Sequence, residues 1–256
     1  MTEWQKRFSL RGKRILVTGA TRGIGFSSCL VLADAGADIV AVGRDSGELS
    51  VVKQAAEKLG AKCVAISADL STLPGVETAG DQGLAAFGGI DILVNNAGIA
   101  LLDTLSEATV EDWDRTMAVN LRAPFLLARK IVIGMIERRE GKIINISSQA
   151  GVNALERHGA YCASKGGLNM LTKVMAAEWA RFNIQSNAIC PNVILTPMGE
   201  KVWGDPEKGD LMKAKTPAGR FGTPVEVADM ILYLASRASD FVCGETMLID
   251  GGYTAV

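Results

Sequence analysis

The chain has 256 residues, 48% of them hydrophobic and 21% charged, which is the balance of a folded globular protein and not of a disordered or fibrous one. Its 27 basic and 28 acidic residues give a formal net charge of −1, and because nucleic-acid binders usually carry a basic excess, we expect no nucleic-acid partner. The sequence shows neither a signal-peptide core nor the roughly 18 apolar residues of a membrane span, so we expect a cytoplasmic protein without a membrane partner.

Short segments rich in β-branched residues alternate with segments of helical period. The predicted strands are residues 14–18, 38–42, 63–67, 90–95, 142–146, 184–189 and 245–249. Helices are predicted over 24–35, 47–59 and 160–181, and the first two end near Gly36 and Gly60, where a glycine caps a helix C-terminus. Strands that alternate with helices in this way predict an α/β fold with a parallel sheet, and no linker divides it.

The first predicted strand runs into a glycine-rich turn that opens a helix, with the sequence Thr18-Gly19-Ala20-Thr21-Arg22-Gly23-Ile24-Gly25. Glycines let the backbone approach a phosphate, and a helix N-terminus supplies free N–H groups and a partial positive charge. The spacing departs from the commonest dinucleotide fingerprint, and glycine turns also serve plain packing. Its place between a strand and a helix nevertheless favours a dinucleotide pyrophosphate site.

The end of the second predicted strand indicates which dinucleotide would bind. It reads Val42-Gly43-Arg44, without the carboxylate that would accept hydrogen bonds from the adenosine ribose. Arg44, together with Arg22 of the glycine turn, supplies two guanidiniums that can pair with a 2′-phosphate, which favours NADP(H). Asp45 leaves two alternatives open, since it could reach a ribose hydroxyl or neutralise Arg44, and all these charges could also be ordinary surface.

Polar residues also follow the third and fourth predicted strands, as Asp69-Leu70 and Asn95-Asn96-Ala97-Gly98. Because the carboxyl ends of parallel strands face the ligand crevice, we expect both segments beside the cofactor. For Asn95 and Asn96 a purely structural role, tying neighbouring strands together, fits equally well.

The candidate chemistry lies in the second half of the chain. Tyr161 and Lys165 are four residues apart in a predicted helix, so they lie on one face. An ammonium near a phenol favours the phenolate, so we expect Lys165 to lower the tyrosine pKa from about 10 toward the neutral range. This spacing alone marks a helix surface more often than a catalytic pair. Ser148, at the end of the fifth strand, favours the catalytic interpretation, because it would point into the same crevice and could hydrogen-bond a carbonyl.

Together the T-G-x-x-x-G-x-G turn, N-N-A-G, Asn120, Ser148 and Y-x-x-x-K resemble the short-chain dehydrogenase/reductase family over nearly the whole chain. The resemblance implies a Rossmann-like, doubly wound parallel sheet with helices on both faces, residues 1–256 forming one NADP-binding domain. It implies that Tyr161 transfers the proton, that Lys165 tunes it and holds the nicotinamide ribose, that Ser148 orients the carbonyl and that Asn120 supports a water-mediated proton relay. It also implies a homotetramer. The expected cofactor-binding residues are Gly19, Thr21, Arg22, Gly23, Ile24, Gly25, Arg44, Asp69, Leu70, Asn96, Tyr161, Lys165, Ile194 and Thr196.

Within that family, residues 147–162 and 197–206 resemble the dicarbonyl/L-xylulose reductases, which reduce small ketoses and α-dicarbonyls with NADPH. The resemblance implies that Ser148, Gln149, Leu155, His158, Tyr161 and Trp203 line the substrate site. The stretch 197–224, rich in Gly, Pro, Lys and Asp, is interpreted as a mobile substrate lid. His158 could instead be a loop histidine without a ligand, and Trp203 could simply cover apolar surface.

Other functions remain as alternatives. A gluconate 5-dehydrogenase-like polyol dehydrogenase shares much of the pattern, and a 3-oxoacyl thioester reductase would use basic residues such as Lys213, Lys215 and Arg220 to dock its carrier protein. A non-catalytic NADP(H) sensor would not need the catalytic residues. A serine hydrolase is disfavoured by the single histidine and the missing G-x-S-x-G. One histidine and five cysteines without a C-x-x-C pair predict neither a metal site nor a disulfide framework.

Overall fold

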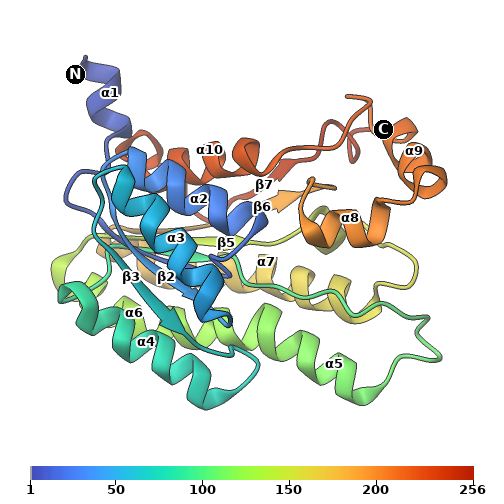
Figure 1. The fold of residues 1–256 in the computed structure, drawn as a ribbon, viewed down its shortest axis with the longest axis horizontal. Coiled ribbons are helices and arrows are strands. Elements are labelled where there is room, and N and C mark those ends of the chain that lie inside the picture. The colour runs from blue at the N-terminus through green and yellow to red at the C-terminus, as the bar shows by residue number, and fades with distance from the viewer. Residues whose placement is uncertain (1) are drawn as a thin grey trace.

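Seven parallel strands form one sheet, in the order β3-β2-β1-β4-β5-β6-β7, in the computed structural model, which describes residues 2–256 (Figure 1). The strands are β1 (Arg14–Thr18), β2 (Asp38–Gly43), β3 (Cys63–Ser67), β4 (Ile92–Asn95), β5 (Gly141–Ile146), β6 (Ile184–Pro191) and β7 (Thr246–Ile249). The strand order reverses between β1 and β4, and in open α/β sheets this is where ligands bind.

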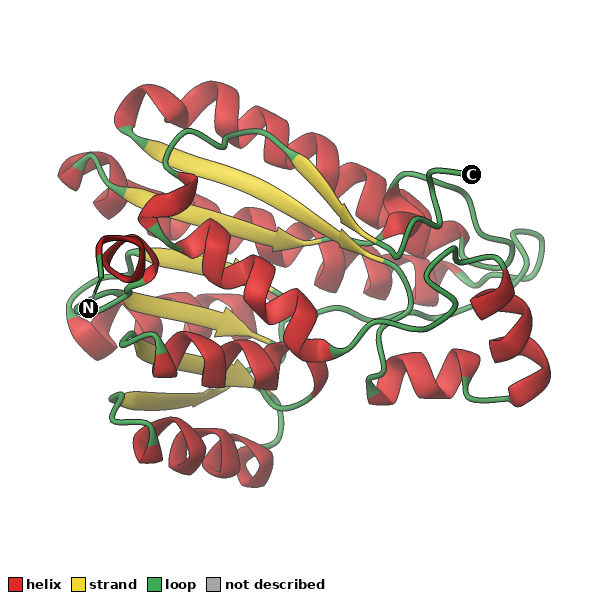
Figure 2. Ribbon diagram, turned by 90° about the horizontal axis from the view of Figure 1, so that it is seen from above, coloured by secondary structure: helices red, strands yellow, loops and turns green. Residues whose placement is uncertain are grey.

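Helices cover both faces of the sheet (Figures 1 and 2). One face packs against α2 (Gly23–Asp34), α3 (Ser46–Lys58) and α10 (Pro224–Ala235). The other packs against α4 (Leu73–Phe87), α6 (Ala123–Arg138) and α7 (Gly159–Trp179). Consecutive residues of β1 alternate between the two cores, Ile15 in one and Leu16 in the other, as a pleated strand requires. Because both faces are covered, the central strands are continuously apolar. The predicted doubly wound fold is confirmed.

The remaining helices lie at the ends of the sheet. They are α1 (Glu3–Phe8), α5 (Val110–Met117), α8 (Pro197–Trp203) and α9 (Pro206–Ala214). The segment predicted as a lid therefore contains two short helices, α8 and α9. Each begins with a proline preceded by a capping residue, Thr196 or Asp205, whose side chain accepts a backbone N–H of the first turn. Within residues 2–256 no helix is both long and apolar enough to cross a bilayer.

The element ends differ from the predictions by one or two residues. The strand predicted from residue 90 begins at Ile92, although the backbone of Asp91 already bonds that of Arg14 and Lys142, and its carboxylate binds the Arg14 guanidinium. The helix predicted from residue 47 begins at Ser46, because the Asp45 carboxylate caps it. The helix predicted over 160–181 runs from Gly159 to Trp179 and closes in a tighter turn at Ala180–Phe182.

Candidate active site

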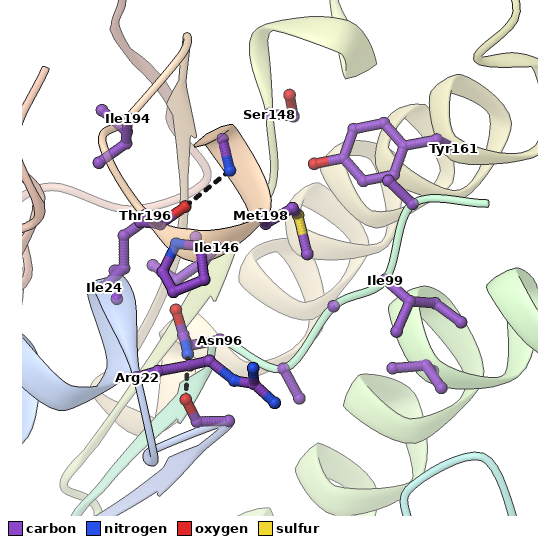
Figure 3. Close-up of a pocket in the computed structure, with 18 of the residues that line it drawn as sticks. Arg22, Ile24, Asn96, Ile99, Ile146, Ser148, Tyr161, Ile194, Thr196 and Met198 are labelled. Carbon is purple, nitrogen blue, oxygen red and sulfur yellow. Dashed lines mark hydrogen bonds between the residues drawn. The ribbon is translucent and has the colours of Figure 1, made fainter. Parts of the chain in front are cut away.

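A cavity of about 860 Å³ lies at the carboxyl ends of the strands, around the point where the strand order reverses. Its volume falls in the range of small-molecule and cofactor sites. It is lined by every residue predicted to bind cofactor or substrate except Gly25, and by three of the four predicted catalytic residues. Asn120 lies behind its wall. Figure 3 shows Ser148 and Tyr161 side by side at one end and Arg22 and Asn96 at the other.

The glycine-rich turn forms the floor of the cavity's cofactor end. Gly19 and Gly23 have φ values of +64° and +55°, which side-chain-bearing residues rarely adopt. Gly25 acts differently, since a Cβ there would collide with the Gly19 carbonyl and lie 2.5 Å from Nδ2 of Asn96. Gly25 does not line the cavity, so its predicted contact with the cofactor stays a prediction. Its missing side chain lets the helix start pack against the turn.

A Gly25→Ala substitution is accordingly expected to push the turn away from Asn96. Overpacking of this kind costs roughly 1–3 kcal/mol, so we expect a lower Tm and a weakened affinity for NADPH. Gly134→Ala is the matched control, because the nearest atom to its Cβ would be Nη1 at the far end of the long Arg138 side chain, 3.0 Å away, and not backbone. Thermal unfolding with and without NADPH measures both effects, and a Gly25→Ala variant as stable as Gly134→Ala contradicts the packing role.

The adenosine end of the cavity carries the two predicted guanidiniums. Arg22 and Arg44 both line it, and within residues 2–256 neither is part of an ion pair. Asp45 also lines this end, and its Oδ1 accepts the backbone N–H of Glu48 at 2.8 Å and so caps α3. Within residues 2–256 Asp45 forms no ion pair with Arg44, and its possible contact with a ribose hydroxyl stays a prediction.

Asp69 forms part of the same end, at the C-terminal side of β3. Its carboxylate accepts the backbone N–H of Ser71 at 3.0 Å, and this bond is the main reason that its pKa is lowered. Arg44 and Arg115 add a smaller electrostatic contribution in the same direction. Asp69 therefore stays an anion and a hydrogen-bond acceptor.

Asn95, the last residue of β4, and Asn96, which follows it, both make structural hydrogen bonds, as one of the two alternatives predicted. Asn95 is buried and donates to Oδ1 of Asn145 at 2.9 Å, which ties β4 to β5. Asn96 lines the cavity, and its Nδ2 donates to the carbonyls of Thr18 and Gly19 at 2.9 and 3.1 Å. Asn96 thereby fixes the glycine turn against the end of β4 (Figure 3).

Tyr161, Lys165 and Ser148 meet at the other end of the cavity. The Lys165 ammonium donates to the carbonyl of Ile146 at 2.7 Å and lies 5.7 Å from the centre of the Tyr161 ring. The Ser148 hydroxyl accepts the backbone N–H of Ala150 at 3.1 Å and hydrogen-bonds the Tyr161 hydroxyl. The neighbouring Ser147 instead donates to the carbonyl of Lys165, which leaves Ser148 as the serine that faces the tyrosine.

The expected lowering of the Tyr161 pKa is wrong in direction. Burial, which penalises the phenolate, raises this pKa, and the hydrogen bond from Ser148 offsets only part of the effect. The same burial lowers the pKa of Lys165 to about 8. The sequence shows the four-residue spacing of the pair but not the surrounding protein that desolvates both side chains.

The lowered pKa of Lys165 has a measurable consequence for stability. Between pH 8 and about 10.4, the ordinary pKa of lysine, residue 165 is protonated in the unfolded chain but not in the folded chain. The free energy of unfolding therefore rises with pH over this range, and the destabilisation caused by burying Lys165 disappears. A Lys165→Met variant lacks the effect. We expect it to exceed the wild type in stability most at pH 7–8, and the difference to shrink by roughly 1.4 kcal/mol per pH unit above pH 8.

Urea unfolding at a series of pH values measures that difference, in a Cys190→Ala background for both proteins because Lys165 and the Cys190 thiol influence each other's pKa. Lys58→Met, at an exposed position of α3, is the control for which the difference should stay constant. If the difference in free energy of unfolding between Lys165→Met and wild type does not change with pH, the pKa of Lys165 is not lowered in the folded protein.

Asn120 occupies a short π-helical turn, Ala118–Arg122, between α5 and α6. Its Oδ1 accepts the N–H of Ile99 and its Nδ2 donates to the carbonyl of the same residue, both at 2.9 Å. Nδ2 also lies 3.1 Å from the Ser164 hydroxyl. The side chain thus fixes the segment after β4. A Cβ on Gly98 would lie 3.5 Å from both Oδ1 of Asn120 and Nζ of Lys165, so both groups approach the backbone there.

The predicted substrate residues all line the end of the cavity near Tyr161. Gln149 is buried, and its Oε1 has no hydrogen-bond partner within residues 2–256. The His158 and Tyr161 rings meet edge to face with centres 6.2 Å apart. Trp203 lines the cavity and also packs on the apolar cluster of Val193, Met212 and Phe221, so it covers apolar surface as one alternative expected, and its contact with substrate stays a prediction.

Some lining residues were missed from the sequence. Met198 and Val202 are one helical turn apart on α8 and both line the cavity, but only the folded position of α8 shows this. Arg115 of α5 approaches the adenosine end near Asp69, although it follows no strand and belongs to no motif. In the part of the chain from residue 2 onward, no group of three His, Cys, Asp or Glu side chains could hold a metal ion.

Known proteins are similar to this chain over nearly its whole length. A family model described as enoyl-(acyl carrier protein) reductase matches residues 19–254. The NAD-dependent glycerol dehydrogenase of Listeria innocua is 42% identical over 251 residues, covering 98% of this chain and 97% of that protein. The L-xylulose reductase of Mesocricetus auratus is 42% identical over 254 residues, covering 95% and 97%. The solved gluconate 5-dehydrogenase of Burkholderia cenocepacia, in complex with NADP and tartrate, is similar with a TM-score of 0.94 and 38% identity, covering 99% and 100%.

Proposed function

The chain belongs to the short-chain dehydrogenase/reductase family, and from this we propose that it is an NADP(H)-dependent oxidoreductase interconverting a carbonyl and a secondary alcohol on a small sugar, polyol or α-dicarbonyl. One observation carries the proposal. A single cavity combines a serine–tyrosine–lysine cluster at one end with two unpaired guanidiniums and a helix N-terminus at the other. The homotetramer and the cytoplasmic location expected from the sequence stay predictions.

The residues present fit a nicotinamide dinucleotide. The glycine turn and the start of α2 offer backbone N–H groups for the pyrophosphate, and Arg22 and Arg44 offer charge for a 2′-phosphate. The Lys165 ammonium uses one proton on the Ile146 carbonyl, so two remain for ribose hydroxyls. The cofactor supplies the hydride chemistry, while the protein positions the substrate and moves its proton.

The proton step is assigned to Tyr161 and Ser148. The raised pKa of Tyr161 keeps its hydroxyl protonated at neutral pH, so it can donate a proton to the substrate oxygen as the carbonyl is reduced. The Ser148 oxygen accepts an N–H from Ala150, and its own hydroxyl proton, which faces Tyr161, can turn to the same substrate oxygen when substrate binds. Alcohol oxidation runs through the same groups in reverse.

The choice between NADP(H) and NAD(H) turns on charges at the adenosine end. NADP(H) is supported by the unpaired Arg22 and Arg44 and by the engagement of Asp45 in capping. NAD(H) has one point in its favour besides the NAD-dependent relative. Glu48 lines the same wall, and within residues 2–256 its Oε2 has no partner, so it could accept a ribose hydroxyl.

A 3-oxoacyl thioester substrate is less well supported than a sugar or polyol. Of the basic residues that could dock a carrier protein, Lys213 pairs with Asp210 at 2.9 Å and Arg220 makes a two-point contact with Glu226. These cations are therefore partly neutralised by the chain itself. A non-catalytic sensor is disfavoured because Ser148, Tyr161 and Lys165 form a complete proton-transfer cluster.

The proposal is tested by supplying each substrate class with each cofactor. We expect the reduced-nicotinamide absorbance to fall with NADPH plus L-xylulose or diacetyl, and to rise with NADP⁺ plus xylitol or threitol. Gluconate and a 3-oxoacyl thioester are included as competitors. Turnover of the thioester alone would overturn the substrate proposal, and turnover of none, with NADPH still bound, would favour the sensor.

A further inference from the structure

His158 is the one histidine of the chain, and its ring is held by a specific contact. Nδ1 lies 2.7 Å from the backbone carbonyl oxygen of Glu156. A carbonyl oxygen can only accept, so Nδ1 must carry the proton, and in the neutral ring Nε2 is then a lone-pair acceptor. Across residues 2–256, the hydrogen bonds of this imidazole all run through Nδ1.

The backbone that carries His158 is in an unusual conformation. Arg157, the residue before it, has a φ of +64°, in the left-handed region that non-glycine residues rarely occupy. Such a conformation persists where neighbouring contacts hold it. Here the contacts come from residues 103–105, which are more than fifty positions earlier in the chain.

We call these contacts the Asp103–Arg157 clasp. Oδ1 of Asp103 lies 3.4 Å from Nη2 of Arg157, and the backbone of Asp103 forms a parallel bridge with that of His158. Leu105 lies over Gly159, where a Cβ would collide with the leucine side chain. One backbone bridge, one side-chain contact and one ion pair therefore connect residues 157–159 with residues 103–105.

The clasp matters because of what else lines this end of the cavity. The Oε1 of Gln149 is a buried acceptor without a partner in the described chain, and Nε2 of His158 is a second acceptor. Two acceptors are satisfied by donors, which on a sugar or polyol are hydroxyl groups. The His158 ring also packs edge-on to the Tyr161 ring, so its partner hydroxyl would be close to the reacting carbon.

We infer that the Asp103–Arg157 clasp is a positioning device that holds His158 as the Nδ1–H tautomer, so that Nε2 accepts a hydrogen bond from a substrate hydroxyl next to the reacting carbonyl. The inference rests on the proposed function for its substrate and deepens it. Hydroxylated substrates gain this bond, whereas diacetyl, which carries no hydroxyl, does not. Asp103 and Arg157 are positioning residues that do not touch the substrate.

The tautomer can be measured without any activity. In protein labelled with ¹⁵N at histidine, the spectrum contains a single imidazole, and its two nitrogen shifts report which one carries the proton. We expect the Nδ1–H pattern in the wild type and a shift toward Nε2–H, the form that free histidine prefers, in Arg157→Gly. Glycine tolerates the left-handed backbone, so this variant removes the ion pair without adding strain. An Nε2–H wild type overturns the inference.

Kinetics then test the consequence for the substrate. We expect Asp103→Asn to raise KM for L-xylulose roughly two- to fivefold, the range that an exposed ion pair supports, with kcat/KM for diacetyl and KM for NADPH unchanged. Asp103→Glu should restore the wild-type value. Asp81→Asn, which breaks the exposed pair with Lys130, is the matched control.

A double-mutant comparison separates positioning from plain stabilisation. In a His158→Ala background, Asp103→Asn should change the L-xylulose parameters no further, because the residue it positions is gone. Equal losses on diacetyl and L-xylulose, or effects that simply add in the double variant, overturn the inference. If the wild type turns over no hydroxylated substrate, the proposed function fails, and the nitrogen spectrum still decides the clasp.

Discussion

A Tyr161→Phe variant is expected to bind NADPH as the wild type does and to lose carbonyl reduction by roughly a thousandfold, within the range that removal of a general acid produces. The substitution deletes only the hydroxyl. The ring would keep its edge-to-face contact with His158 and its position beside the Lys165 ammonium. The loss should therefore fall on kcat, with the cofactor Kd unchanged.

Two measurements check this expectation. Single-turnover reduction of diacetyl or L-xylulose reports the chemical step, and quenching of protein fluorescence by NADPH reports binding. Ser148→Ala is the companion variant, because it removes the second hydroxyl at the substrate oxygen and should cost less than the loss of the proton donor. Turnover by Tyr161→Phe at a rate near that of the wild type would show that the proton comes from another group.

The fold was predictable because its signals are local and repeated. Each buried strand is a short β-branched run, and the first two crossover helices end near Gly36 and Gly60, whose φ values are +100° and +88°. The predicted boundaries differ from the observed ones by one or two residues at several ends, because the ends of elements fray and periodicity locates them poorly. At α3 a side chain is the cause, since Asp45 caps the helix and moves its start to Ser46.

The site was predictable where motifs lie at strand ends, and less so where burial decides. The positions of Ser148 and Tyr161 follow from the sheet, but the direction of the tyrosine pKa depends on desolvation that the sequence does not display. Gly25 belongs to the glycine motif, yet it serves packing. Asn120 belongs to the family pattern, yet its amide is bonded to the backbone of Ile99 behind the cavity wall.

Contacts between distant segments were beyond sequence reasoning altogether. Arg115 reaches the adenosine end from a helix that carries no cofactor motif. Asp103 meets Arg157 across 54 residues of chain, and neither belongs to a recognisable pattern. Such pairs are set by the packing of whole elements, so only the folded chain brings them together.

Cofactor preference provides the second large effect. In Arg44→Asp we expect kcat/KM with NADPH to fall roughly 10- to 100-fold, because a charge-assisted hydrogen bond is worth roughly 1.5–3 kcal/mol and the new carboxylate would repel the 2′-phosphate. With NADH the value should hold or rise, since an acidic residue at this strand end suits a ribose hydroxyl. The preference should thus narrow or reverse.

The control must make the same change of charge elsewhere, and Arg7→Asp on the exposed helix α1 does so. It should leave kcat/KM with both cofactors unchanged, apart from long-range electrostatic effects that salt screens.

Glu48→Gln further separates the two ways in which the adenosine ribose could be recognised. If Glu48 binds a ribose hydroxyl, the variant lowers kcat/KM with NADH more than with NADPH. If Arg22 and Arg44 provide most of the binding, kcat/KM with NADPH changes little. Equal kcat/KM for NADPH and NADH in the wild type would contradict the assignment, because two unpaired guanidiniums beside the adenosine ribose must distinguish a dianionic phosphate from a hydroxyl if they contact it.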